Sequence, residues 1–133
     1  MKVVVVGAGS WGTALAIHAA RAGCEVALWA REREVVEGIA TARRNPLFIP
    51  EFEVPAGVTA ESDVAAACTG AHAVLFVVPV QFARHVLAEM RGALAADALF
   101  ISASKGIELG TLERMDEIAA AELRLAPERF VAL

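Results

Sequence analysis

The sequence predicts an α/β fold in which helices wind around both faces of a parallel sheet, and three observations lead to this prediction. Short apolar runs rich in β-branched residues alternate with longer helix-forming segments, as in βαβ units with right-handed crossovers. Apolar residues make up 57% of the chain, which suits a sheet covered on both faces. A length of 133 residues is typical of one domain, so residues 1–133 are expected to form a single doubly wound unit.

The expected strands are the apolar runs, and the expected helices fill the intervals between them. The strands are Lys2–Val6, Glu25–Trp29, Val58–Ala60, Ala73–Val78, Leu99–Ser102 and Arg129–Leu133. The helices are Ser10–Ala22, Glu32–Ala42, Ser62–Cys68, Val80–Leu94 and Thr111–Leu123.

Several of these boundaries have their own chemical signals. Gly23 is predicted to close the first helix, because glycine readily adopts the left-handed conformation found at helix ends. Ser62 with Asp63 is predicted to cap the third helix, and Thr111 the last one. Residues 45–55 are the exception: three prolines exclude a regular element, yet four large apolar side chains are too many for a solvated loop. This proline-rich segment is expected to pack across the sheet edge or beside a ligand.

The first expected strand runs directly into Gly7-Ala8-Gly9-Ser10-Trp11-Gly12, a G-x-G-x-x-G pattern that opens a helix-forming segment. In this setting Gly7 permits a tight turn, Gly9 lets a phosphate approach the backbone, and Gly12 lets the helix pack closely. The positive end of the helix then faces the phosphates. The pattern therefore predicts a Rossmann-like sheet that binds a dinucleotide.

Two other interpretations compete for this N-terminal stretch. A signal peptide would explain Lys2 before an apolar run, but three glycines in register fit poorly in its helical core, and a second strand pattern follows. A structural glycine turn in a flavodoxin-like protein without nucleotide is the other alternative. A Walker P-loop is excluded, because no Gly-Lys-Ser/Thr follows the glycines.

Composition narrows the function classes further. The formal net charge is −4 and no basic stripe occurs, which argues against a nucleic-acid partner. No apolar run has the length of a membrane span. Cys24 and Cys68 are isolated and form no metal-binding pattern, so we expect no metal site and interpret both as small buried side chains in a reducing cytoplasm.

In parallel α/β sheets, ligands bind beyond the carboxyl ends of the strands, and four candidate sites fall there. The first is the glycine turn, where Ser10 adds a hydroxyl and Trp11 an apolar wall. Ser10 also suits an ordinary helix N-cap. Trp11 is expected to contact the cofactor, because a large aromatic side chain at an exposed turn needs something to cover it.

The second site follows the second strand. Ala30 occupies the position where a carboxylate would accept a hydrogen bond from the ribose of NAD, and Arg31 and Arg33 flank Glu32. An arginine there pairs with the 2′-phosphate of NADP, so the pattern favours NADPH over NADH without excluding NADH. The alternative is a solvated helix start.

The third and fourth sites follow the strands near residues 78 and 102. Pro79 ends a strand and fits the first turn of a helix, and Gln81 and Phe82 are placed to line a cofactor trough. For Phe82 we favour a position in the core, paired with Val86. Lys105 is placed to present its ammonium group to a substrate phosphate, hydroxyl or carbonyl oxygen, the alternative being a surface lysine in a turn.

Taken together, these motifs resemble one family, the bacterial NAD(P)-dependent glycerol-3-phosphate dehydrogenases, and the resemblance covers the whole chain. The segments that carry it are Gly7–Leu15, Leu28–Arg31, Asn45-Pro46 with Ile49-Pro50, Val77–Pro79 and Lys105–Glu108. It implies reversible reduction of dihydroxyacetone phosphate to sn-glycerol 3-phosphate, a step that feeds phospholipid synthesis. The cofactor-binding residues that motif and resemblance together predict are Gly7, Gly9, Ser10, Trp11, Gly12, Arg31, Glu32, Pro79 and Lys105.

Within this family Lys105 would contact both cofactor and substrate and act as the catalytic residue of this half. After Leu133 the family continues with Ser-Gly-Pro and a largely helical domain that carries the lysine acting as general acid and base. Residues 1–133 are therefore expected to be the cofactor-binding part of a longer, cytoplasmic, homodimeric enzyme, with little turnover alone. The alternatives are a related dehydrogenase of the ketopantoate or 6-phosphogluconate type, and a nucleotide-sensing module without catalysis.

Overall fold

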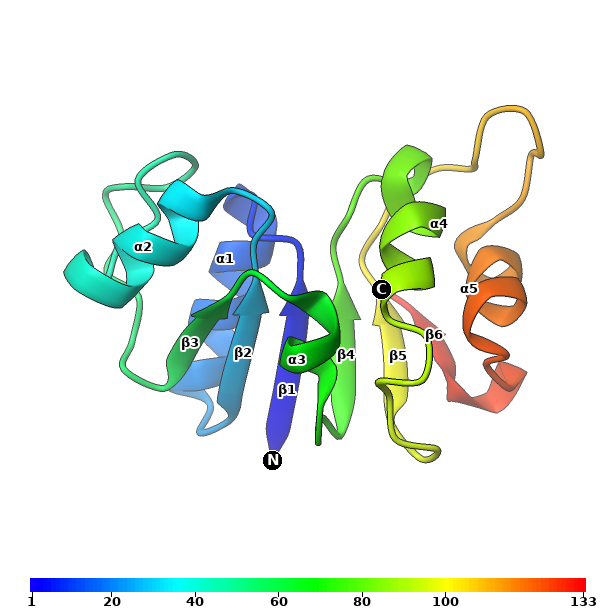
Figure 1. Ribbon diagram of the computed structural model, residues 1–133, viewed down its shortest axis with the longest axis horizontal. Helices are drawn as coiled ribbons and strands as arrows, with labels where there is room; N and C mark the ends of the chain where they lie inside the picture. Colours follow the sequence, from blue (N-terminus) through cyan, green and yellow to red (C-terminus); the bar gives the residue numbers. More distant parts are fainter.

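The computed structural model describes residues 1–133 and contains one six-stranded, fully parallel sheet (Figure 1). Across the sheet the strands follow the order β3-β2-β1-β4-β5-β6. Their bounds are β1 Lys2–Val6, β2 Glu25–Trp29, β3 Val58–Glu61, β4 Ala73–Phe76, β5 Leu99–Ser102 and β6 Phe130–Ala132. This is the doubly wound order of dinucleotide-binding sheets, and it confirms the predicted fold class.

Helices cover both faces of the sheet. The helices are α1 Ser10–Arg21, α2 Arg33–Ala42, α3 Val64–Cys68, α4 Val80–Glu89 and α5 Met115–Leu123, with a 3₁₀ turn at Pro127–Arg129. The first two helices share one apolar core with the sheet, and the last three share a second core on the opposite face. In Figure 1, α1 lies behind the sheet and α3 in front of it. No helix is long and apolar enough to cross a membrane.

The central strand β1 shows why this arrangement is stable. Its valines alternate between the cores, so that Val4 and Val6 pack with α3 and α4 while Val5 packs against α1 and α2. All three are fully buried, and each such side chain contributes about 1.5–3 kcal/mol. Cys68 is buried as predicted, in the core shared by α3, α4 and α5, and burial raises the pKa of its thiol to about 12. Cys24 is only half-buried, contrary to expectation.

The strand predictions are the most accurate, and the helix ends differ most. The strand predicted over Ala73–Val78 ends at Phe76, and the helix predicted over Val80–Leu94 ends at Glu89. Chain reversal after α4 uses Gly92, whose φ of +75° lies in the left-handed region. The helix predicted from Thr111 begins only at Met115.

Of the predicted helix boundaries, some are confirmed and others are wrong. Gly23 closes α1 with a positive φ of +90°, and its N–H donates to the carbonyl of Ala20. Asp63, rather than Ser62, caps α3 by accepting two backbone hydrogen bonds at 2.9 and 3.1 Å. Thr111 caps no helix, because its hydroxyl bonds to a carboxylate in its own loop.

The proline-rich segment packs beside the carboxyl edge of the sheet, as predicted. Val54 is buried in the core shared by α1 and α2, while Phe48 faces a cleft above the strand ends. The side chain of Arg43, at the end of α2, donates to the carbonyls of Val54, Pro55 and Val58. These bonds tie the C-terminal end of the segment and the start of β3 to the end of α2.

Candidate functional site

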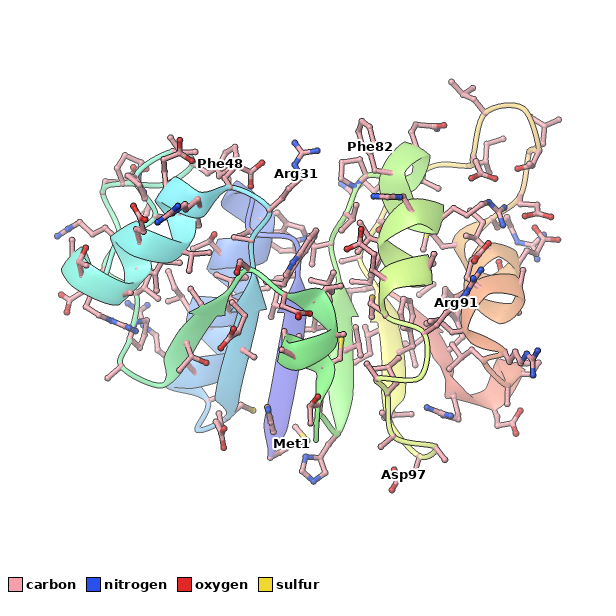
Figure 2. All side chains as sticks on the ribbon, in the orientation of Figure 1. Met1, Arg31, Phe48, Phe82, Arg91 and Asp97 are labelled. Atoms are coloured by element: carbon pink, nitrogen blue, oxygen red, sulfur yellow. The ribbon has the colours of Figure 1, made fainter.

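The carboxyl ends of four neighbouring strands lie level at one edge of the sheet. The register pairs Val6 with Trp29 on one side and with Phe76 on the other, and Phe76 with Ser102. Strand order reverses between β1 and β4, which is where open α/β sheets bind ligands. A cleft of about 400 Å³ opens at this point. Figure 2 shows Arg31, Phe48 and Phe82 along this edge, with Met1 at the opposite one.

The glycine turn forms the floor of the cleft. Gly7 has a φ of +111°, which turns the chain out of β1. A Cβ on Gly12 would lie 1.8 Å from the carbonyl oxygen of Gly7, so the helix can begin this close to the turn only with glycine there. A Cβ on Gly9 would have no neighbour within 4 Å, because it would point into open space. The backbone at Gly9 is therefore open to a ligand.

The N-terminus of α1 supplies hydrogen-bond donors at the same place. The first helical hydrogen bond joins the N–H of Thr13 to the carbonyl of Gly9 at 2.9 Å, so the N–H groups of the three preceding residues have no helical partner. Gly9 is the N-cap, so the N-cap interpretation of Ser10 is wrong. The Ser10 hydroxyl instead donates to the carbonyl of Phe48 at 3.0 Å. Trp11 is 53% exposed and lines the cleft.

These features fit a dinucleotide. Unpaired N–H groups and the helix dipole attract a pyrophosphate, and the open backbone at Gly9 lets it approach. Apolar side chains on either side, among them Phe48 and Phe82, suit flat rings.

Of the candidate residues at the end of β2, two line the cleft and the others do not. Ala30, at the usual carboxylate position, is fully buried, and its methyl side chain has no group that could bind a ribose hydroxyl. Arg31 and Glu32 line the cleft, and the Arg31 side chain is 77% exposed, with one nitrogen 3.4 Å from the Glu32 carboxylate. Arg33 does not line it and pairs with Glu37 along α2 at 2.7 Å.

At the start of α4 the structure differs from the expectations for both Pro79 and Phe82: β4 ends at Phe76, three residues before Pro79. Pro79 lines the cleft, as the N-cap of α4 rather than a residue of its first turn. Phe82 does not face the core but is 59% exposed and lines the cleft. The buried residues of α4 are Val80, Ala83, Val86 and Leu87, of which Val86 also lines the cleft. Phe82 precedes Ala83 by one residue and therefore points about 100° away from it.

Lys105 follows β5 and lies at the same edge. It lines a second cavity, of about 590 Å³, together with Trp11 and Pro79, which also line the first cleft. Its ammonium group is exposed and belongs to none of the ion pairs. The structure thus places a free positive charge beside the predicted cofactor cleft.

Gln81 does not line the cleft but fixes the loop that carries Lys105. Its amide donates to the carbonyl of Ile107 and accepts from the N–H of Leu109, both at 2.9 Å. Phe82, its neighbour in α4, faces the cleft. The same turn of α4 therefore contacts both the cleft and the Lys105 loop.

Arg84 adds an ion-pair network that sequence reasoning missed. Its guanidinium contacts the carboxylates of Glu108 at 2.8 Å, Glu113 at 2.6 Å and Glu122 at 2.9 Å. Arg91 also pairs with Glu122. Hydrogen bonds from Arg84 lower the pKa of both Glu108 and Glu122 below the ordinary glutamate value. No local pattern signals the network, because its carboxylates lie 24, 29 and 38 residues from Arg84 in the chain.

We expect Arg84→Met to lower the thermal unfolding midpoint at pH 7 by roughly 5–10 °C, because two largely buried carboxylates lose their main donor. A lowered folded-state pKa contributes stability above the ordinary glutamate pKa, and this stability is lost as the pH falls through the folded value. The loss of stability on acidification should therefore be shallower in the variant. Melting curves at pH 7 and pH 4 test both effects. Arg33→Met, which removes only an exposed pair, is the control; equal midpoints for the two variants would contradict the role of Arg84.

Comparison with known proteins gives consistent matches. The family model described as NAD-dependent glycerol-3-phosphate dehydrogenase N-terminus matches residues 2–133. A curated relative from Trichlorobacter lovleyi, named glycerol-3-phosphate dehydrogenase [NAD(P)+], is 48% identical over 134 residues, which is 100% of this chain and 40% of the relative.

Solved structures agree with the sequence matches. The crystal structure of glycerol-3-phosphate dehydrogenase from Coxiella burnetii has a TM-score of 0.85 and 31% identity, covering 93% of this chain and 38% of that one. A PanE/ApbA family ketopantoate reductase from Ralstonia eutropha reaches a TM-score of 0.75 at 29% identity, covering 99% of this chain and 40% of that one. The chain spans about 40% of the length of the curated relatives it matches.

Proposed function

Because the chain belongs to the family of NAD-dependent glycerol-3-phosphate dehydrogenases, matching its N-terminal part, we propose that it is the cofactor-binding half of such an enzyme. The proposed reaction is the reversible reduction of dihydroxyacetone phosphate by NAD(P)H and a proton, giving sn-glycerol 3-phosphate and NAD(P)⁺. The observation that carries the proposal is the cleft at the switch point, with its open backbone at Gly9 and its unpaired helix N–H groups.

In this proposal, different residues along the carboxyl edge of the sheet bind the pyrophosphate, the cofactor rings and the substrate. The N–H groups at the start of α1 hold the pyrophosphate, and the flanking aromatic side chains cover the rings. A nicotinamide cofactor bound here would supply or accept the hydride at the substrate C2. Lys105 orients the substrate and polarises its carbonyl oxygen, a role supported by its position lining the cavity next to Trp11 and Pro79. The general acid and base is expected outside residues 1–133.

The cofactor preference proposed is NADPH over NADH. An exposed Arg31 at the rim of the cleft can turn toward a 2′-phosphate, and the buried Ala30 offers no carboxylate to a free ribose hydroxyl. A charge-assisted bond to phosphate is stronger than a neutral one, by about tenfold or more in affinity.

We expect Arg31→Ala to remove this preference. In the purified chain NADPH should bind about tenfold more tightly than NADH, and the substitution should bring the two affinities together. Tryptophan quenching and nicotinamide fluorescence at one ionic strength measure both. Arg33→Ala is the matched control, because Arg33 carries the same charge two residues away but lies outside the cleft. A preference that survives Arg31→Ala would show that another group recognises the phosphate.

A ketopantoate-type dehydrogenase is the second candidate, favoured by the structural likeness to the reductase from Ralstonia eutropha. Assays of the full-length protein with glycerol 3-phosphate, pantoate and 6-phosphogluconate in parallel distinguish the candidates. Turnover of glycerol 3-phosphate alone supports the first. Absence of any turnover with intact nucleotide binding would favour a sensing module. A homodimeric full-length form in the cytoplasm belongs to the same proposal, and the two free cysteines are compatible with that compartment.

A further inference from the structure

Asn45, at the start of the proline-rich segment, is fully buried, and its side chain uses its whole hydrogen-bonding capacity. The amide nitrogen donates to the carbonyl of Ala8 and to the hydroxyl of Thr13, both at 2.8 Å. The amide oxygen accepts from the N–H groups of Leu47 and Phe48, both at 3.2 Å. One side chain therefore joins the glycine turn to the segment that forms a wall of the cleft.

Thr13 completes the link from behind the glycine turn. It is fully buried in α1, and its hydroxyl donates to the carbonyl of Ala8 at 3.2 Å while accepting from Asn45. The carbonyl of Ala8 thus has two donors on the side away from solvent. This arrangement fixes the orientation of the turn next to Gly9.

Phe48 is held from two sides. Its N–H donates to Asn45, and its carbonyl accepts from the Ser10 hydroxyl at 3.0 Å. The ring itself is 40% exposed and lines the cleft. Together with the N–H of Leu47, which also donates to Asn45, these bonds tie this stretch of backbone to the glycine turn.

Anchoring of the segment as a whole does not require Asn45. Arg43 binds the carbonyls of Val54, Pro55 and Val58 at the far end, and Val54 is buried in the core. Asn45 instead acts at the cleft end, where Phe48 lies.

We propose that Asn45 is a positioning residue for the dinucleotide: it holds Phe48 against the cleft in the orientation that the ligand needs, and ties it to the phosphate-binding turn. The inference rests on the proposed function, because it assumes that the cleft binds a dinucleotide. If the Phe48 wall of the cleft is already ordered in the free protein, binding does not incur the entropy cost of ordering it. Immobilising one such side chain corresponds to a factor of about three to ten in affinity.

The test is a double-mutant cycle on the purified chain with NADPH and NADH as probes. Asn45→Ala and Phe48→Ala should each weaken binding of the preferred dinucleotide, Asn45→Ala by about three- to tenfold. If Asn45 acts through Phe48, adding Asn45→Ala to the Phe48→Ala variant should cause no further loss. A general structural role would make the two losses multiply, which would overturn the proposal. Arg43→Met is the control, expected to lower the melting temperature while leaving the affinity unchanged.

A second pair of variants serves if Asn45→Ala does not fold. Thr13→Val removes the hydroxyl that accepts from Asn45 and keeps the shape of the side chain, whereas Thr13→Ser keeps the hydroxyl. Weaker binding by the valine variant and recovery with serine would support the proposal, and equal binding by both would overturn it. Wild-type chain that binds neither nucleotide would reject the proposed function as well. Wild-type binding that Asn45→Ala leaves unchanged would reject only the role of Asn45.

Discussion

Gly12→Ala is expected to lower the free energy of unfolding by about 3 kcal/mol or more. This is the largest stability effect that we expect from a substitution in the glycine turn. The added Cβ would lie 1.8 Å from the oxygen and 2.9 Å from the carbon of the Gly7 carbonyl. Both atoms belong to the backbone of the turn after β1, so no side chain can move aside. Urea unfolding of the two proteins side by side measures the difference.

Gly9→Ala is the matched control within the same turn. Gly9 has a φ of −66°, which alanine adopts without strain, and its Cβ would have no neighbour within 4 Å. Stability should change by less than about 1 kcal/mol, whereas dinucleotide affinity should fall at least about tenfold because the methyl group would occupy the approach of the phosphate. Equal stability losses for the two variants would contradict the steric argument.

Lys105→Met is expected to have the largest effect on catalysis. If Lys105 polarises the substrate as proposed, kcat/KM of the full-length protein should fall about 10²–10³-fold, the usual effect of removing one donor that stabilises a developing oxyanion. The melting temperature should be unchanged, because the Lys105 side chain is exposed and belongs to no ion pair. Steady-state kinetics with glycerol 3-phosphate give the measurement.

Lys2→Met provides the comparison for Lys105→Met, since Lys2 is the other lysine of the chain and its ammonium group donates to a backbone carbonyl at the opposite end of the sheet. Its kcat/KM should match that of the wild type. Full activity of Lys105→Met would show that Lys105 does not polarise the substrate.

Local sequence predicts best the elements whose structure depends on residues close together in the chain. The continuous apolar runs of β1, β2 and β5 begin and end as predicted, because buried parallel strands require this pattern along their whole length. The glycine turn is equally well predicted, since its spacing is a steric requirement between atoms five residues apart.

The predictions that differ from the structure do so because of contacts between residues far apart in the chain. The late start of α5 follows from the Lys105 loop being bound to α4 by Gln81 and Arg84, a contact over 24 residues or more. Phe82 is exposed because the sheet covers another face of α4. Its spacing of four residues from Val86 fits both a core position and a cleft position. The sequence marks Asn45 only as part of a motif, because burial and four simultaneous hydrogen bonds have no local signature.

The end of β2 has a consequence for how such a protein can change over evolutionary time. Ala30 is fully buried and Arg31, its neighbour, projects a side chain that is 77% exposed. If Arg31 recognises the 2′-phosphate as proposed, the requirement for a buried side chain falls on the first position and the choice of nucleotide on the second. A lineage could then exchange residue 31 and shift its dependence between NADPH and NADH, while the sheet beneath it stays the same.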